Sequence, residues 1–327
     1  MSAASLLSEL RRRDIQLRAE GSELRCSAPA GVLTVELREQ LRQYKSDLLA
    51  LLASAQAMAT QARAVVPLQP TGGRAPVFGV PGHNGDVFCY RLLSQGLGED
   101  QPFFGLQPPG LDGSAEPLRR VQDLAAYFVE QMRAFGHQGA CVVAGFCAGG
   151  TVAFELARQL AARAIPIRFL ALFGCPYPMY FTHRAQLWLR PLQKVQHAKK
   201  HARELGARSW SERRAYLAEM LHARRAWREA KRAARIDPVL ARRAAVERAT
   251  LAAVREYVPP HFAGRVALFL PGHEWRNAGV DALRWRSIVA EAREYFGPEA
   301  STGTDMLREA HAAAFAELFR RACKECT

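Results

Sequence analysis

The residue best suited to nucleophilic chemistry is Cys147, which lies in the run VVAGFCAGG over residues 142–150. Apolar, β-branched residues precede the cysteine and a helical pattern follows it, an order typical of a strand, a sharp turn and a helix. Gly145 and Gly149 stand where such a turn leaves no room for a Cβ atom. A thiol at the amino end of a helix experiences the positive end of the helix dipole, so Cys147 is predicted to ionise without a strong base. The alternative is a buried and inert cysteine.

The segments around this turn alternate between buried strands and helices. Strands are expected at 76–81, 102–106, 142–146, 167–173 and 265–270, and helices at 121–135, at 151–162 and up to about residue 322. This alternation implies an α/β fold, in which a mostly parallel sheet is covered by helices on both faces. From about 178 to 256 the pattern is helical only, so this insertion is expected to form a helical lid over the turn.

A separate small domain is predicted for residues 1–54. Leucines at positions 6, 7 and 10 form one helical stripe, a hairpin-like stretch follows, and further leucines form a second helical stripe. An α+β unit of this size buries little surface and is not expected to hold an enzyme site. Residues 55–72, rich in Ala, Gln and Ser, are predicted to be a linker, and residues 73–327 the larger domain.

The formal net charge of +14 and the pI near 9.9 indicate an acidic partner. Most of the excess basic residues lie between Tyr177 and Glu256, in the predicted lid. The sequence shows no helix-turn-helix, zinc-finger or aromatic-basic RNA-binding signature, so a nucleic-acid partner is not expected. A solvated helix face is the alternative explanation of this charge.

No apolar stretch reaches the roughly 18 residues of a membrane span, and the first residues lack a signal-peptide pattern. The chain is therefore expected to be soluble and cytoplasmic, without a membrane partner. Its seven cysteines are irregularly spaced, which favours reduced thiols over disulfides. Cys323 and Cys326 form a C-x-x-C pair without a second pair or a nearby histidine, so we expect no metal and no cofactor bound by the chain.

The small N-terminal domain resembles the TubC-type docking domains of nonribosomal peptide synthetase subunits. The resemblance rests on the segments LLSEL at 6–10, DIQL at 14–17, APAGVLT at 28–34 and YKSDLL at 44–49. It implies that this domain recognises a short acidic or linear segment at the end of a partner synthetase.

The larger domain resembles the thioesterase domains of nonribosomal peptide and polyketide assembly lines, which have an α/β-hydrolase fold. The shared segments are a Pro-Gly loop at 81–82, the glycine-flanked elbow, YVPP at 257–260, GRV at 264–266 and MLREAH at 306–311. The resemblance covers about residues 67–322. It implies that the backbone N–H groups of Gly82 and Ala148 form the oxyanion hole.

The chain departs from that family at three positions. The usual nucleophilic serine is Cys147, the usual acid after the next strand is Gly174, and the usual histidine before the Met-Leu pair is Gly303. Hydrolysis needs a base that activates water, and a histidine held by a carboxylate is the usual source of one. An acyl group on Cys147 is therefore expected to react slowly with water and readily with another thiol.

Three positions are candidates for a relocated acid or base. His83 lies beside the oxyanion loop, although a loop histidine is often merely exposed. His273, next to Glu274, lies at the end of a predicted strand. Asp305 lies in the loop of the missing histidine, with a helix N-cap as the alternative role. His311 is expected to pack on a helix face.

A Cys elbow in a thioesterase-like domain resembles the aminoacyl shuttles of syringomycin and coronamic acid biosynthesis. The resemblance implies transfer of an aminoacyl or short acyl group between the phosphopantetheine thiols of acyl or peptidyl carrier proteins. Such carriers are commonly acidic, which suits the basic lid. An editing or releasing thioesterase with a relocated histidine and a non-catalytic adaptor remain the alternatives. The sequence does not identify the acyl group.

Overall fold

The computed structural model describes residues 6, 10, 15–20, 23–28, 34–45, 48–49, 64–113, 115–182, 214, 238–272 and 282–326. Within the N-terminal part, strands β1 (Gln16–Glu20) and β2 (Glu23–Ser27) pair as an antiparallel hairpin. Helix α2 (Val35–Gln43) follows, and its N-cap Thr34 accepts a hydrogen bond of 3.3 Å from the N–H of Leu37.

This N-terminal unit has a hydrophobic cluster of its own. Its buried members are Leu6, Leu10, Ile15, Leu37, Leu41 and Leu48. The pairing of β1 with β2 confirms the predicted hairpin. Burial of Leu37, Leu41 and Leu48 confirms most of the second leucine stripe, whose last member, Leu52, lies outside the described residues.

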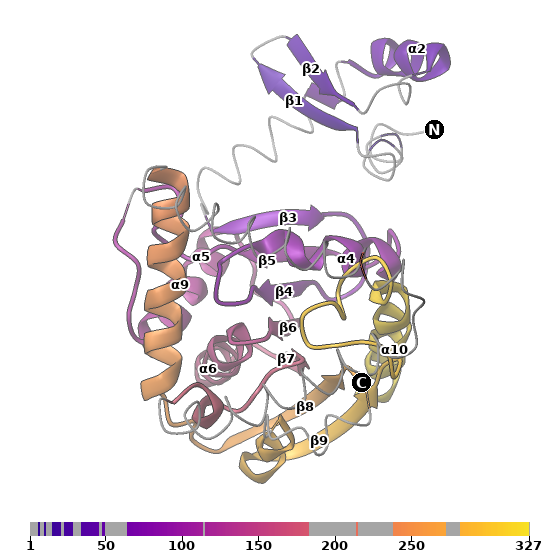
Figure 1. Cartoon of the computed structure of the whole chain (residues 1–327). Coiled ribbons are helices and arrows are strands. Elements are labelled where there is room, and N and C mark those ends of the chain that lie inside the picture. Colours follow the sequence, from indigo (N-terminus) through magenta and orange to yellow (C-terminus); the bar gives the residue numbers. More distant parts are fainter. Residues whose placement is uncertain are drawn as a thin grey trace.

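The larger unit is built on a seven-stranded sheet with the order β3-β5-β4-β6-β7-β8-β9 (Figure 1). The strands are β3 (Val65–Gln69), β4 (Val77–Val80), β5 (Phe103–Leu106), β6 (Cys141–Phe146), β7 (Ile167–Phe173), β8 (Phe262–Leu270) and β9 (Val289–Phe296). Strand β3 is antiparallel to its neighbour, and every other pairing is parallel. The predicted mostly parallel sheet is therefore confirmed.

Two strands were not expected. The linker predicted for residues 55–72 includes residues 65–69, but these form β3, which pairs with β5 at the edge of the sheet. Pro67 is compatible with this strand because an edge strand leaves some backbone N–H groups unpaired. At the opposite edge, the sequence pattern does not predict β9, because charged residues interrupt the apolar pattern that marks a buried strand.

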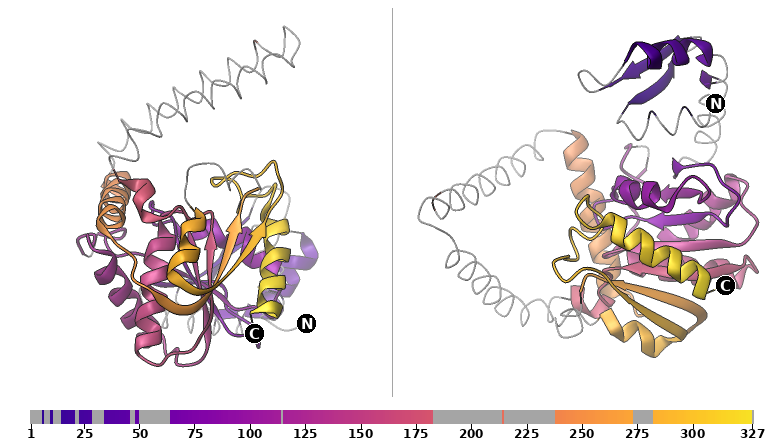
Figure 2. Two further views of the ribbon diagram at one scale, coloured as in Figure 1. Left: turned by 90° about the horizontal axis from the view of Figure 1, so that it is seen from below. Right: turned by 90° about the vertical axis from the view of Figure 1, so that its right-hand side faces the viewer.

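Helices cover both faces of the sheet (Figures 1 and 2). Helices α4 (Arg91–Leu97) and α10 (Ala312–Glu325) lie on one face, where they share a core with Phe173 and Phe269. Helices α5 (Val121–Ala134), α6 (Gly149–Ala162) and α9 (Pro238–Glu256) contribute to the core on the other face. Short 3-10 helices are η1 (Val87–Tyr90), η2 (Pro178–Phe181) and η4 (Ala282–Ile288).

The carboxyl ends of the central parallel strands meet at one edge of the sheet. Val80 is paired with Gly145, Phe146 with Phe173, and Phe173 with Phe269. The loops that follow β4, β6 and β7 therefore converge there.

Of the predicted lid at 178–256, the structure describes 178–182, residue 214 and 238–256, which include η2 and α9. The rest of that prediction lies outside the described residues. Among the helices that the structure describes, none is long and apolar enough to cross a membrane.

Candidate active site

Cys147 occupies the turn between β6 and α6 in a left-handed backbone conformation, with a φ of 50°. Its N–H donates a hydrogen bond of 3.0 Å to the carbonyl of Phe173, and its carbonyl accepts one of 3.1 Å from the N–H of Gly150. A non-glycine residue in this region of backbone space is strained and must be held by its surroundings. The geometry matches a nucleophile elbow, which projects the central side chain above the sheet.

The glycines around the elbow are required by close backbone contacts. A Cβ atom on Gly145 would lie 2.6 Å from the Cα of Gly150, and one on Gly149 would overlap the carbonyl oxygen of Pro81. The second contact brings the loop after β4 against the first turn of α6. The spacing of these glycines therefore fixes where the oxyanion loop lies relative to Cys147.

The electrostatic environment of Cys147 differs from the sequence prediction. Burial raises the pKa of its thiol above the usual range, and a backbone hydrogen bond from Ala148 only partly offsets this effect. The prediction of a thiol that ionises readily at the helix terminus is therefore wrong for the free protein. The physical reason is that the thiolate loses more hydration on burial than the first amide of α6 replaces.

The two expected oxyanion donors both lie beside the thiol. A Cβ atom on Gly82 would be 3.9 Å from the Cβ of Cys147, and Ala148 follows the nucleophile directly at the start of α6. The backbone of Gly82 also forms a hydrogen bond with the thiol of Cys89, a residue that sequence reasoning did not single out. Burial nevertheless raises the pKa of Cys89 to about 12, so this second thiol stays protonated.

The two missing members of the family's catalytic group correspond to neighbouring positions in space. Gly174 directly follows β7, and a Cβ atom on it would lie 3.5 Å from the Cα of Gly303 and 2.8 Å from the Sδ of Met306. Side chains at both glycine positions would therefore touch, as an acid and a histidine must. Neither of these two positions carries an ionisable side chain.

A third thiol, that of Cys175, lies beneath the elbow. Its Sγ donates hydrogen bonds to the carbonyl oxygens of Gly145, at 3.2 Å, and of Phe173, at 3.3 Å. Burial raises the pKa of this thiol far above its usual range. Cys175 therefore supports the backbone of the turn as a neutral donor.

His83 contacts Glu247, a residue that no sequence pattern associates with it. Its Nε2 lies 3.5 Å from Oε1 of Glu247 on α9, while its Nδ1 is buried without a hydrogen-bond partner among the described residues. Glu247 has no motif around it and lies far away in the chain, so no sequence signal could have paired the two. Where the two side chains meet depends on how α9 packs.

Asp305 has a local structural contact instead of a helix-capping role. Its Oδ1 accepts a hydrogen bond of 2.6 Å from the N–H of Thr302 and lies 3.9 Å from Nε2 of His311. No helix begins at Met306: α10 begins at Ala312, with His311 as its N-cap. The helix N-cap role for Asp305 is therefore wrong. His311 stands at the N-cap position of α10 instead of within a helix, but its side chain is only 15% exposed, as expected for a packing residue. His273 and Glu274 lie outside the described residues.

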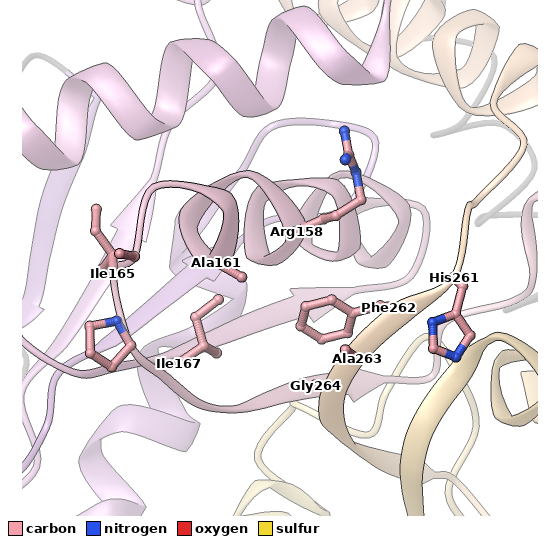
Figure 3. Close-up of a pocket in the computed structure, with 10 residues that line it drawn as sticks. Arg158, Ala161, Ile165, Ile167, His261, Phe262, Ala263 and Gly264 are labelled. Carbon is pink, nitrogen blue, oxygen red and sulfur yellow. The ribbon is translucent and has the colours of Figure 1, made fainter.

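A pocket of about 440 Å³ lies away from the thiol (Figure 3). It is lined by Ala161 near the end of α6, Ile167 at the start of β7 and Phe262 at the start of β8. Cys147 precedes the opposite end of α6, roughly 18 Å along the helix axis. Within the described ranges, no group of three or more His, Cys, Asp or Glu side chains could hold a metal ion.

Comparisons with known proteins assign both units. Residues 75–319 match the thioesterase domain family, and residues 4–54 match the TubC N-terminal docking domain. Indigoidine synthase from Dickeya dadantii is 35% identical over 114 residues, which are 34% of this chain and 8% of that protein. Polyketide synthase PksR from Bacillus subtilis is 29% identical over 113 residues, 35% of this chain and 4% of that protein. The chain thus matches only a small part of these relatives.

Solved structures show the same fold. The Vlm2 thioesterase domain, bound with a dodecadepsipeptide, has a TM-score of 0.56 at 21% identity over 80% of this chain and 98% of that domain. The NocB thioesterase domain from the nocardicin cluster has a TM-score of 0.57 at 20% identity over 80% of this chain and 99% of that domain. The α/β-hydrolase fold is therefore confirmed. With three quarters of its length matched by one family, the chain belongs to the thioesterase domain family and carries a TubC-type docking domain at its N-terminus.

Proposed function

We propose that this protein transfers an aminoacyl or short acyl group between the phosphopantetheine thiols of two carrier proteins, through an acyl thioester on Cys147. The observation that carries the proposal is the contact between Gly174 and Gly303. A hydrolytic thioesterase needs an acid and a histidine to activate water, and glycine occupies both positions here.

The transfer consists of two thiol–thioester exchanges. The sulfur of Cys147 attacks the carbonyl carbon of the donor thioester, a new carbon–sulfur bond forms, and the bond to the donor sulfur breaks. The proton of Cys147 ends on the departing phosphopantetheine thiol. The acceptor thiol then repeats these steps in reverse. Because one thioester replaces another, each exchange is nearly isoenergetic and needs no further reagent.

The strained elbow supports this role for the cysteine. The left-handed conformation of Cys147 costs energy, and such strain is typical of catalytic turns. The thiol is accessible enough to react, since Cys147 is only half-buried, whereas Cys175 beneath it is fully buried. Of these two thiols at the elbow, Cys147 is therefore the one that a carrier arm can reach.

The docking domain would select the partner synthetase, and the positive charge of the chain would favour an acidic carrier protein. The N-terminal unit belongs to a class of docking domains, so a partner synthetase is the expected binding target. The net charge of +14 favours an acidic carrier, and Arg243 and Arg248 are exposed on α9. The phosphopantetheine arm belongs to the carrier, and this chain need not bind a cofactor of its own.

The test uses an acyl-loaded donor carrier and an empty phosphopantetheinylated acceptor. Intact mass spectrometry should show the acyl mass on this protein and then on the acceptor. Cys147→Ala should remove both signals. Acceptor loading at the uncatalysed rate, with no adduct on the wild-type protein, would overturn the proposal.

A second candidate, an editing thioesterase, is favoured by one observation. The contact between His83 and Glu247 supplies an imidazole and a carboxylate near the elbow. If these groups activate water, free acid should accumulate over many turnovers and His83→Asn should abolish it. Acceptor loading without free acid would decide for transfer.

A further inference from the structure

Nδ1 of His83 is a buried polar atom that nothing in the described structure satisfies. Buried polar atoms are nearly always hydrogen-bonded, so a buried atom without a hydrogen-bond partner indicates a specific role. The same ring is not wholly buried: the side chain of His83 is 38% exposed and that of Glu247 is 44% exposed. A contact this exposed adds little stability, so its main effect is to orient the imidazole.

The contact with Glu247 also decides which nitrogen is basic. A neutral imidazole carries one proton, and a neighbouring carboxylate holds that proton on the nitrogen that faces it. Nε2 faces Glu247 at 3.5 Å, so Nε2 carries the hydrogen and Nδ1 keeps its lone pair. In catalytic triads a carboxylate fixes the tautomer in the same way. The distance is long for a hydrogen bond, as such contacts often are before substrate binds.

The loop that carries His83 lies beside the thiol. His83 follows Gly82, whose Cβ position lies 3.9 Å from the Cβ of Cys147. On the other side, a Cβ atom on Gly85 would lie 3.4 Å from Cγ1 of Val246 on α9. The loop that carries His83 is thus packed between the elbow and the helix that carries Glu247.

We propose that Glu247 positions His83 so that Nδ1 of the imidazole accepts the proton of the Cys147 thiol. As the carbon–sulfur bond to Cys147 forms, the proton moves from sulfur to Nδ1, and it then passes to the sulfur that leaves the donor thioester. His83 is the catalytic residue in this step and Glu247 a positioning residue. The inference rests on the proposed role of Cys147 as nucleophile, but it holds for transfer and for hydrolysis alike.

Other ionisable groups near the pair must be considered in any pH experiment. Asp86 lies on the same loop, and its side chain accepts a hydrogen bond of 3.0 Å from the N–H of Phe88. The thiols of Cys89 and Cys175 and the phenol of Tyr90 interact electrostatically with Cys147. Burial raises the pKa of each of these three groups, so they remain neutral near pH 7.

The test measures alkylation of Cys147 by iodoacetamide in the full chain, followed as a function of pH on the peptide that contains Cys147. His83→Asn should move the midpoint of this profile to higher pH and lower the rate at pH 7 by about tenfold, the change that one unit of thiol pKa produces. Glu247→Gln should shift the profile in the same direction, and Glu247→Asp should restore part of the loss.

The matched control is Glu256→Gln, which changes an exposed carboxylate at the end of the same helix and should leave the profile unchanged. Profiles of His83→Asn and Glu247→Gln that coincide with the wild type would overturn the inference. If His83→Asn does not fold, Glu247→Gln decides alone. No carrier protein is used, so this result is independent of whether transfer between carriers occurs.

Discussion

Gly174 and Gly303 come from distant parts of the chain and lie side by side, with a Cβ position on Gly174 only 3.5 Å from the Cα of Gly303. The loop after β7 and the loop before α10 therefore still meet as they would around an acid and a histidine. The two loops keep this geometry, but glycine at both positions supplies neither a carboxylate nor an imidazole.

Gly174→Asp combined with Gly303→His should turn the protein toward hydrolysis. Aspartate tolerates the left-handed backbone at position 174, where φ is 50°, and the flexible end of Met306 can move aside. The lifetime of the acyl adduct on Cys147 should fall by about 100-fold, the lower end of what a general base contributes. Intact mass spectrometry after acylation by a small thioester measures this lifetime. Neither single substitution should reproduce the effect.

Cys147→Ser should inactivate the protein even though serine is the usual residue in the family. A serine hydroxyl needs a strongly placed base, and none stands at positions 174 and 303. Acylation by a small thioester should slow by about 100-fold or more. Adding Gly174→Asp and Gly303→His to the serine variant should recover part of the rate. A serine variant that acylates like the wild type would contradict this prediction, because glycine at positions 174 and 303 would then not limit activation of the hydroxyl.

Gly149→Ala should be strongly destabilising, because its Cβ would overlap the carbonyl oxygen of Pro81 and backbone atoms cannot step aside. We expect a loss of about 3 kcal/mol or more in the free energy of unfolding. Gly139→Ala is the control, since a Cβ there meets nothing within 4 Å, and it should stay within about 0.5 kcal/mol of the wild type. Urea unfolding of the three proteins measures both values.

A buried carboxylate should make the stability of the larger unit depend on pH. Glu155 on α6 accepts hydrogen bonds of 2.8 Å from Nε and Nη2 of Arg158, 2.9 Å from Gln159 and 2.6 Å from the hydroxyl of Tyr257. Burial by itself would raise the pKa of Glu155, but these donors outweigh it and the pKa is lowered. The stabilisation is therefore complete above the unfolded-state pKa of about 4.3 and is lost as the pH falls through the folded-state value.

Tyr257→Phe removes one of these donors. It should cost about 1.5–3 kcal/mol at neutral pH, the usual worth of a hydrogen bond to a charged group. It should also move the acid loss to higher pH, because the folded-state pKa of Glu155 rises. Chemical unfolding at a series of pH values between about 3 and 7 checks both effects. Glu155→Gln should flatten this part of the pH dependence.

The local parts of the site could be predicted from the sequence. The strand, elbow and helix around Cys147 follow from adjacent residues, because a sharp turn needs glycine at fixed offsets from the nucleophile. The core strands β4, β5, β6, β7 and β8 were also predictable, since each is a short apolar run bounded by turn residues. Strands β3 and β9 were not, because edge strands carry weaker apolar patterns.

What the sequence determined by itself is the identity of the groups: a thiol at the elbow, and glycine where an acid and a histidine usually stand. Only the tertiary structure decided how those groups behave. Burial, which depends on packing, raised the pKa of Cys147 where helix position alone predicted easy ionisation. The packing of α9 brought Glu247 to His83, a contact between distant residues that no local pattern encodes. Local spacing fixes which residue stands in a turn, whereas desolvation and long-range contacts exist only once the chain has packed.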